Sequence, residues 1–385
     1  MPPAETMISR ERVIRALRRE PIDRTPIDMG AFTSSGISAF AYWRLREHLG
    51  LPTGDITICD TVQFLAKVDP DILERFHCDL LFLQPPWPAS KRWSPRPPFE
   101  FSIPAAMNPR LNAEGEWIVE KTLAGGKIGT MRMPPGGYFF DGAWLREDYP
   151  GTEEESLAAY AREAERIYKE TPFACAYLGL HGFFSGIEQG VRMLLEPAEE
   201  RERIERSCDA MIERFYRVNE AMGRYIQIVV IGNDMGGQNG PLVRPESIHE
   251  FCGPAYTRFC AAVHAHSDIK VLLHNCGSVR AMIPYIVEWG VDAMNPVQIS
   301  AARMDPAELK REFGDRLVFW GGGCDTQHVL GSESPDGVAR NVRHLMGIFK
   351  QGGGYVFNAV HNIQGDVPPQ NIVAMLETAW EASAV

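Results

Sequence analysis

A histidine and a cysteine, His274 and Cys276, stand two positions apart at the end of a short apolar run, and both side chains can bind a metal. The run at 271–273 is rich in branched residues, as a buried strand would be, and a helical pattern begins at about Val279. Residues two apart in a strand point the same way. We therefore predict that the imidazole and the thiol converge at the C-terminal end of this strand. Zinc favours such ligands, and its catalytic sites add a third protein ligand and keep one position open.

Taken alone, each residue has a simpler interpretation: Cys276 as an inert buried thiol and His274 as a hydrogen-bonded core histidine. Two later stretches favour a site instead. One apolar run ends in glycines followed by Cys324, and another ends in polar residues that include His361. We predict Cys324 as the third metal ligand, with His361 as its competitor. Spacing along the chain does not decide between them, because the fold brings these strands together.

The totals exclude some classes of function. The formal net charge of -11 argues against nucleic acid or an anionic membrane as the main partner. The 8 cysteines are scattered through 385 residues without a signal peptide pattern, which favours reduced thiols and a cytoplasmic location. No apolar run approaches the roughly 18 residues of a membrane span.

From residue 153 onward, strand patterns alternate with helical patterns. The expected strands are 173–180, 227–231, 269–273, 292–295, 317–320 and 355–358. The expected helices are 153–169, 183–195, 197–225, 245–267, 279–289, 306–313, 335–351 and 369–382. Such alternation implies parallel βαβ units, and this many in succession favours an α/β fold closed as a (β/α)8 TIM barrel, with residues 1–385 as a single domain.

Residues 84–150 differ from the rest. Proline, glycine and tryptophan are frequent there, and residues 115–119 and 126–131 alternate like an antiparallel hairpin. We interpret 84–150 as an insertion, or a lid over the barrel mouth. Its aromatic residues, including Tyr138 and Trp144, are candidates to line an apolar substrate pocket, although packing of the hairpin onto the body explains each one equally well.

Barrel enzymes place their chemistry at the C-terminal ends of the strands. Here one end carries Asn233, Asp234 and Gln238, and the last carries Asn358 and His361. We predict Asn233, Gln238, Asn358 and Tyr138 as substrate-binding residues and Asp234 and His361 as catalytic. Asp234 has three candidate roles: a fourth ligand, a general base, or an acceptor for the second N–H of His274.

Together these residues resemble the uroporphyrinogen decarboxylase superfamily, and more closely its branch of corrinoid-dependent methyltransferases. The resemblance runs nearly end to end, is weakest over 84–150, and implies a (β/α)8 barrel. The matching residues lie at 9–13, 23–26, 233–240, 274–279, 290–298, 321–327 and 361–364.

In the methyltransferase branch, the residues matching His274 and Cys276 bind zinc together with a later cysteine. Some members carry that cysteine on the last strand, where this chain has His361, and Cys324 stands one strand earlier, as in members suspected of acting on methoxy compounds. True decarboxylases of the superfamily hold a tetrapyrrole with an arginine-rich N-terminal loop. The corresponding residues 27–33 contain no arginine, so porphyrinogen decarboxylation is not expected.

The resemblance implies a zinc-dependent methyltransferase of the O-demethylase type. It would move a methyl group between a small O- or S-methyl compound, with an aryl methyl ether favoured, and a corrinoid (cobalamin) cofactor. Corrinoid proteins usually offer an Asp-x-His-x-x-Gly motif, and residues 325–331 have one residue too many for it. We therefore expect the corrinoid to bind transiently or to arrive on a separate corrinoid-binding protein, and the chain is a candidate homodimer.

Two other classes of function stay open. A metal-independent decarboxylase of a small or cyclic carboxylic acid would use Asp234 or His361 as acid or base. A non-catalytic corrinoid or tetrapyrrole carrier would keep the barrel but need no site with three ligands. The metal content of the purified protein distinguishes the decarboxylase and the carrier from a zinc methyltransferase.

Overall fold

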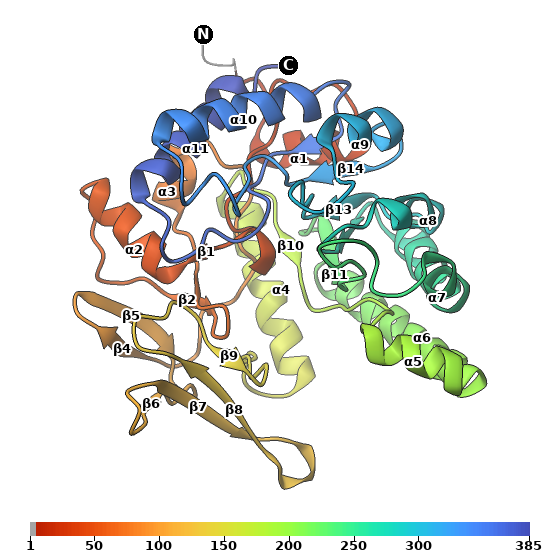
Figure 1. Ribbon diagram of the computed structural model, residues 1–385, viewed down its shortest axis with the longest axis horizontal. Helices are drawn as coiled ribbons and strands as arrows, with labels where there is room; N and C mark the ends of the chain where they lie inside the picture. Colours follow the sequence, from red (N-terminus) through yellow and green to blue (C-terminus); the bar gives the residue numbers. More distant parts are fainter. Residues whose placement is uncertain (1–4) are drawn as a thin grey trace.

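A curled sheet of parallel strands forms the body of the molecule in a computed structural model that describes residues 5–385 (Figure 1). Its strands are neighbours in chain order, so each strand–helix–strand unit returns beside the previous one. The strands are β10 (Ala176–Tyr177), β11 (Ile228–Gly232), β12 (Lys270–His274), β13 (Ala293–Asn295), β14 (Val318–Trp320) and β15 (Tyr355–Val356). The register aligns Gly232 with His274 and His274 with Asn295, so three strand ends reach the same level.

Two short N-terminal segments continue this sheet at both edges. Leu80 forms a parallel bridge with Ala174 beside β10, and Ile27 forms one with Phe357 just after β15. The two segments also meet each other, because the Asp79 N–H donates to the Ile27 carbonyl over 2.8 Å. Backbone pairing therefore runs on through both segments, which gives the fold its TIM-barrel-like form.

The strands are apolar on both faces because each face is covered. In β12, Leu272 packs in the cluster inside the barrel, whereas Val271 and Leu273 pack outward against the helices. Val13 and Leu17 of the first helix belong to the interior cluster, so that helix fills the barrel from the end opposite to the strand tips.

Helices cover the outside of the sheet (Figure 1). They are α2 (Ala39–His48), α3 (Pro70–Arg75), α4 (Glu153–Glu170), α5 (Ile187–Leu195), α6 (Pro197–Met222), α7 (Pro245–His266), α8 (Ile283–Glu288), α9 (Pro306–Phe313), α10 (Pro335–Phe349) and α11 (Pro369–Ala382), whereas α1 (Ser9–Arg18) is the first helix, which fills the barrel end. The helix predicted over 183–195 begins only at Ile187. Residues 183–186 form a turn instead, in which Gly186 has φ 97° and the Ser185 N–H donates to the Gln189 side chain.

Antiparallel strands occupy residues 90–142 and lie to one side of the barrel (Figure 1). The strands are β4 (Ser90–Arg96), β5 (Phe99–Pro104), β6 (Arg110–Leu111), β7 (Trp117–Thr122), β8 (Ile128–Met133) and β9 (Asp141–Gly142); β1 (Ile37–Ser38), β2 (Ile58–Asp60) and β3 (Leu65–Ala66) form a small sheet nearby. β7 pairs with β8 with Trp117 opposite Met133. Edge-to-face contacts join Phe40 of α2 to Phe101 of β5 at 5.1 Å, and Phe101 to Phe64 at 5.3 Å. An aromatic core therefore fixes this region to the barrel.

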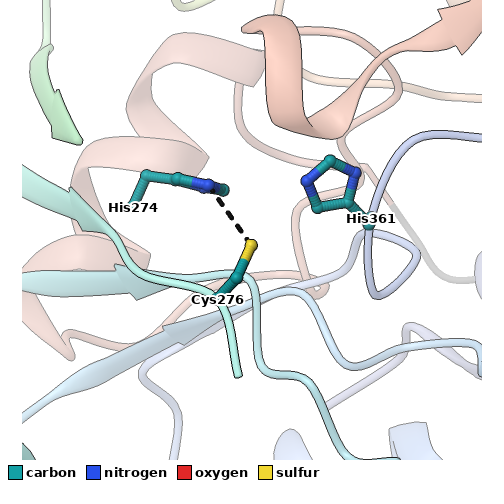
Figure 2. Close-up of side chains that lie close together, drawn as sticks. All are labelled: His274, Cys276 and His361. Carbon is teal, nitrogen blue, oxygen red and sulfur yellow. Dashed lines mark hydrogen bonds between the residues drawn. The ribbon is translucent and has the colours of Figure 1, made fainter. Parts of the chain in front are cut away.

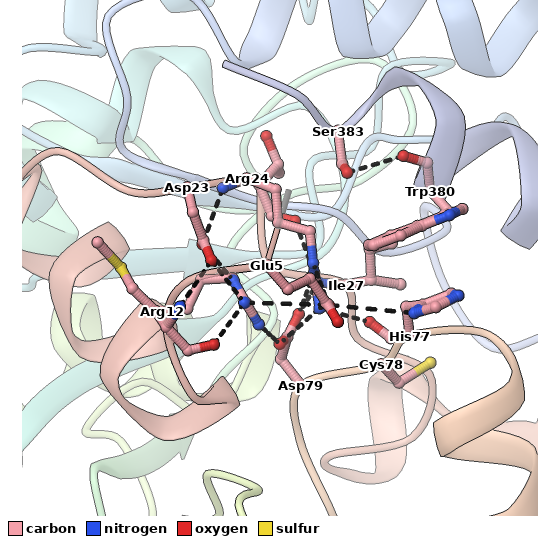
Figure 3. A network of polar contacts seen from close by, with 12 residues as sticks. Glu5, Arg12, Asp23, Arg24, Ile27, His77, Cys78, Asp79, Trp380 and Ser383 are labelled. Carbon is pink, nitrogen blue, oxygen red and sulfur yellow. Dashed lines mark hydrogen bonds and ion pairs between the residues drawn. The ribbon is translucent and has the colours of Figure 1, made fainter. Parts of the chain in front are cut away.

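A buried ion-pair network holds α1 against the barrel (Figure 3). Arg12 of α1 lies 2.7 Å from Asp23 and 2.6 Å from Asp79, and Arg24 lies 2.7 Å from the other oxygen of Asp79. Both arginines are 1% exposed and Asp79 is fully buried, so every charge is compensated inside the protein. This network gives a structural role to Arg12, Asp23 and Arg24 within the stretches 9–13 and 23–26.

No helix in the described part of the chain is both long and apolar enough to cross a membrane.

Candidate metal centre

Three side chains meet at the C-terminal ends of the barrel strands: His274 and Cys276 at the end of β12, and His361 on the loop after β15 (Figure 2). Their nitrogen and sulfur atoms lie within 4.8 Å of one another. The Cys276 Sγ is 3.4 Å from the His274 Nε2, as expected for residues two apart at a strand end. The His274 and His361 rings stand 5.9 Å apart at 70°. Nitrogen and sulfur atoms therefore face one small volume.

The other ring nitrogen of His274 is held by Asn295, at the end of β13. Asn295 Nδ2 donates to the Trp320 carbonyl over 3.0 Å, which leaves its Oδ1 as an acceptor. That oxygen lies 3.2 Å from His274 Nδ1 and also accepts from the Ser34 hydroxyl at 3.0 Å. The hydrogen of a neutral His274 is thereby placed on Nδ1, and the lone pair of Nε2 points into the cluster.

Asp234 follows β11 and lies beside the same cluster. Its Oδ1 is 3.6 Å from His274 Nε2 and accepts the backbone N–H of Cys276 over 2.9 Å. The Nδ1 side of His274 is already taken by Asn295. Of the three roles predicted for Asp234, the geometry therefore favours those on the cluster side, as a further ligand or a base.

The surroundings keep the cluster uncharged when it is empty of cations. Burial lowers the pKa of His274, and burial together with the neighbouring His274 lowers the pKa of His361 to about 4. Burial, followed by the charge of Asp234, raises the pKa of the Cys276 thiol. Neutral imidazoles are the ligand form of histidine, and a nearby divalent cation favours the thiolate.

The donor set fits a zinc ion. A tetrahedral zinc with Zn–N of about 2.0–2.1 Å and Zn–S of about 2.3 Å places its nitrogen and sulfur ligands about 3.5 Å apart. The observed separation of 3.4 Å between Nε2 and Sγ agrees with this value. Two imidazoles and one thiolate also leave a fourth position for a substrate atom or for Asp234.

The predicted third ligand, Cys324, lies elsewhere. Its side chain is fully buried in the hydrophobic core near Tyr355 of β15, whose pKa is raised chiefly by burial and further by Cys324. Gly321 and Gly322 turn the chain with φ of 112° and 69°, and Gly323 packs so closely that an added Cβ would lie 2.4 Å from Phe357. This turn directs Cys324 away from the strand tips. His361, the competitor named in the sequence analysis, lies in the cluster in place of Cys324. Metal binding by these residues and a catalytic role for His361 stay predictions.

The residues predicted to bind substrate lie around the cluster but mostly serve the protein itself. Asn233 Oδ1 accepts from the Tyr256 hydroxyl at 2.6 Å, and Asn358 Nδ2 donates to the Asp28 carbonyl at 3.1 Å. Gln238 accepts from the Gln298 side chain at 3.1 Å. Gln298 in turn accepts the N–H of Gly277 at 2.8 Å, so Gln238 supports the turn that carries Cys276.

Tyr138 lines a cavity of about 240 Å³ together with Phe139, Phe140 and Trp144. Asn362, which follows His361, lies in the same wall. Residues of the segment 138–144 therefore line a cavity whose wall also includes Asn362, the residue next to His361 in the chain. Asn295 and Asn362 were the polar neighbours that sequence reasoning passed over, because an asparagine at a strand end is ordinarily a loop cap.

A family model described as uroporphyrinogen decarboxylase (URO-D) matches residues 173–382, which is more than half of the chain and includes the whole cluster. The chain belongs to the uroporphyrinogen decarboxylase family. Curated relatives include the uroporphyrinogen decarboxylase of Legionella pneumophila (strain Corby), 23% identical over 381 residues and 96% of each chain. That of Methylococcus capsulatus is 22% identical over 395 residues, which is 96% of this chain and 97% of the relative.

Among solved structures, a methyltransferase from Methanosarcina mazei matches with a TM-score of 0.56. The match covers 97% of this chain and 98% of the methyltransferase at 12% identity. This chain and the methyltransferase therefore share a fold along nearly their whole length. The match to the URO-D family model makes the chain a member of an enzyme superfamily.

Proposed function

We propose that this URO-D family protein is a zinc-dependent methyltransferase that moves a methyl group between a small O- or S-methyl compound and a corrinoid. The observation that carries the proposal is the cluster of His274, Cys276 and His361 at the mouth of the barrel. A methyltransferase with the same fold along the whole chain supports it. The curated relatives bear the name of decarboxylases, which keeps that reaction as the second candidate.

In this proposal the cluster residues hold the zinc and Asn295 fixes the orientation of His274. Zinc supplies Lewis acidity, which lowers the pKa of a bound oxygen or sulfur atom and so makes it a better leaving group or nucleophile. Asp234 is 57% exposed, with Oδ1 beside the cluster, so it can hold the proton of a substrate hydroxyl or thiol at that oxygen.

The corrinoid is proposed to arrive on a separate protein that docks at the barrel mouth, or to bind transiently. His328, the histidine of the near-motif at 325–331, is bonded through Nδ1 to Asp325 at 3.0 Å. This hydrogen bond engages His328 in a surface turn of this chain. The arrangement is compatible with a cobalt ligand that comes from the partner protein and not from His328.

An aryl methyl ether is the favoured methyl donor. Aromatic side chains of the segment 138–144 line the cavity whose wall includes Asn362, and a small ring compound would bury apolar surface against them. Tyr138 is proposed to contact the ring of this donor.

Porphyrinogen decarboxylation fits the residues of this chain less well. The segment 27–33, where tetrapyrrole-binding members carry arginines, buries Met29, Ala31 and Phe32 here and contains no arginine. A substrate with many carboxylates would find no cation in that segment.

The reaction is tested with zinc-loaded protein, free cob(I)alamin and methoxylated aromatic compounds, following methylation of the cobalamin by its visible spectrum. We expect methylation that depends on zinc and falls at least about 100-fold in Cys276→Ala, because a lost ligand costs more than the 10–100-fold of an outer contact. Absence of methylation by zinc-loaded protein, together with CO₂ release from a small or cyclic acid, would establish the decarboxylase instead.

Loss of the Asn295 amide oxygen, which holds His274 Nδ1, should weaken zinc binding without removing a ligand. Asn295→Leu frees the ring of His274 and is expected to lower zinc affinity roughly 10–100-fold. Asn295→Asp keeps an acceptor for His274 Nδ1 and should retain most of the affinity, since carboxylates commonly fill this role. Competition with a chromophoric chelator measures both values, and equal affinity of the leucine variant and wild type would exclude a positioning role.

A further inference from the structure

Asp28 is a buried carboxylate on the N-terminal segment that pairs beside the end of β15. The residue is 1% exposed, and burial raises its pKa to about 6, so the side chain is mostly ionised at neutral pH. The groups that hold its two oxygens are neutral N–H donors and not cations. Burial of an ionised carboxylate costs free energy that such bonds offset only in part. We therefore looked for what these two bonds do besides stabilising the fold.

One oxygen of Asp28 holds the end of β14. Oδ2 accepts the indole N–H of Trp320 over 2.8 Å, and the Trp320 ring packs against Phe32 in the interior of the barrel, with centroids 5.6 Å apart. The Trp320 carbonyl accepts Nδ2 of Asn295 over 3.0 Å. Because a carbonyl can only accept, this bond turns the amide nitrogen of Asn295 toward β14 and its oxygen toward His274.

The other oxygen of Asp28 holds a turn. Oδ1 accepts the backbone N–H of Ala31 over 2.8 Å, in a turn where Gly30 has φ 98°. The chain then leads to Ser34, whose hydroxyl donates to Oδ1 of Asn295 over 3.0 Å. The two oxygens of one carboxylate therefore hold two groups that both bond the same asparagine.

Asn295 connects this arrangement to the metal centre. Its Oδ1 has two lone pairs, of which one accepts from Ser34 and the other faces His274 Nδ1 at 3.2 Å. Asn295 is fully buried, so a rotated amide would leave buried partners unsatisfied. The orientation of His274 therefore depends on Asp28 through both of its oxygens.

The segment around Asp28 does not need this side chain to stay in place. The backbone N–H of Asp28 donates to the Phe357 carbonyl over 2.8 Å, and its carbonyl accepts Nδ2 of Asn358 over 3.1 Å. These bonds and the bridge between Ile27 and Phe357 join the segment to the end of β15 whatever side chain stands at position 28. The carboxylate is therefore available to hold the two partners of Asn295.

We propose that Asp28 is a positioning residue of the metal centre. Its two oxygens hold Trp320 and the turn of Ser34, and these two groups fix the amide of Asn295. Asn295 in turn orients the ring of His274 for metal binding. The inference rests on the zinc centre of the proposed function but not on methyl transfer.

The test compares wild type with Asp28→Asn by zinc affinity and by the visible spectrum of the cobalt(II) form. An amide offers one acceptor and one donor, so its NH₂ group must face the N–H of either Trp320 or Ala31, and one bond is lost. We expect zinc affinity, from competition with a chromophoric chelator, to fall roughly 3–10-fold. This is less than for Asn295→Leu, because the contact is one step farther from the metal. The cobalt bands should shift, since they report the arrangement of the ligands. Wild-type affinity together with a wild-type spectrum would overturn the proposal.

The matched control is Glu200→Gln on α6. It makes the same change from carboxylate to amide at a side chain that is 1% exposed and pairs with Arg192 at 2.8 Å. We expect this variant to lose stability in urea but to keep the zinc affinity and the cobalt spectrum of wild type. An equal change in the control would overturn a specific role for Asp28.

Ser34→Ala is the second variant, should Asp28→Asn fail to fold. It removes only the last bond of the route through the turn. We expect zinc affinity to fall about threefold, with a smaller shift of the cobalt bands. Unchanged affinity and an unchanged spectrum in this variant would overturn the proposal.

The positioning role and the methyltransferase function can fail separately. Wild type that binds zinc more tightly than Asp28→Asn, but transfers no methyl group, refutes the methyltransferase and leaves the role of Asp28 standing. Wild type that transfers the methyl group, with an unaltered metal centre in Asp28→Asn, refutes the positioning role and leaves the methyltransferase standing.

Discussion

Protein purified without chelator should carry about one zinc ion per chain, and His274→Ala, Cys276→Ala and His361→Ala should each lose it. The reason is that the three ligand atoms face one volume, within 4.8 Å of one another. Loss of any one leaves two donors, and we expect the affinity to fall at least about 100-fold. Metal analysis of each variant by atomic emission, after gel filtration, makes the measurement.

Cys324→Ala is the matched control for this experiment. It also removes a thiol, but from a fully buried position in the hydrophobic core near Tyr355 of β15. We expect this variant to keep its zinc and to lose some stability from the small cavity. Loss of zinc in Cys324→Ala, with retention in His361→Ala, would contradict the arrangement seen at the barrel mouth. A wild type that binds no zinc on reconstitution would exclude the metal centre altogether.

Asp79→Ala should cause the largest loss of stability of any single change in the N-terminal network. Asp79 is fully buried and accepts from Arg12 at 2.6 Å and from Arg24 at 2.7 and 3.0 Å. It also accepts the backbone N–H of Ile27, which belongs to the segment beside β15. Its removal leaves two buried guanidinium groups without that partner, and we expect the free energy of unfolding to fall by roughly 3–5 kcal/mol. Urea denaturation at neutral pH measures the change.

The control for this change is Glu381→Ala on α11. Glu381 pairs with Arg343 at 3.3 Å, but both side chains are more than half exposed, so the free energy of unfolding should change by at most about 1 kcal/mol. If Asp79→Ala proves too unstable to purify, Asp79→Asn keeps the volume and some acceptor capacity and should show an intermediate loss. Equal midpoints for Asp79→Asn, Glu381→Ala and wild type would show that the network does not stabilise the barrel.

Much of the fold follows from local pattern. Strands such as β12 are read directly from apolar runs, and the long helices α4, α6 and α7 from their periodicity and flanking prolines. The alternation of the two predicts parallel pairing, because a crossover helix returns each strand beside the last. The turn at 183–186 was predicted as helix because Phe183 and Phe184 continue the apolar spacing of the helix that follows. The Gln189 side chain, which accepts the Ser185 N–H, and the positive φ of Gly186 decide its shape instead.

The convergence of His274 and Cys276 could likewise be predicted from the sequence, since alternation along one strand fixes their common direction. The third member of the cluster could not be predicted in this way. Cys324 and His361 both follow strand ends, and only the course of each loop decides whether its side chain reaches the mouth. Glycines with positive φ at 321 and 322 turn Cys324 into the core, and the loop after β15 carries His361 to the cluster.

The sequence by itself determined the alternating strands and helices and the two metal-binding residues that share one strand end. Those features depend on neighbours along the chain, whose geometry is set by backbone periodicity. Only the tertiary structure decided that His361 rather than Cys324 completes the cluster, and that Asn295 orients His274. These depend on contacts between residues far apart in sequence, because closure of the barrel and packing of its loops place them side by side.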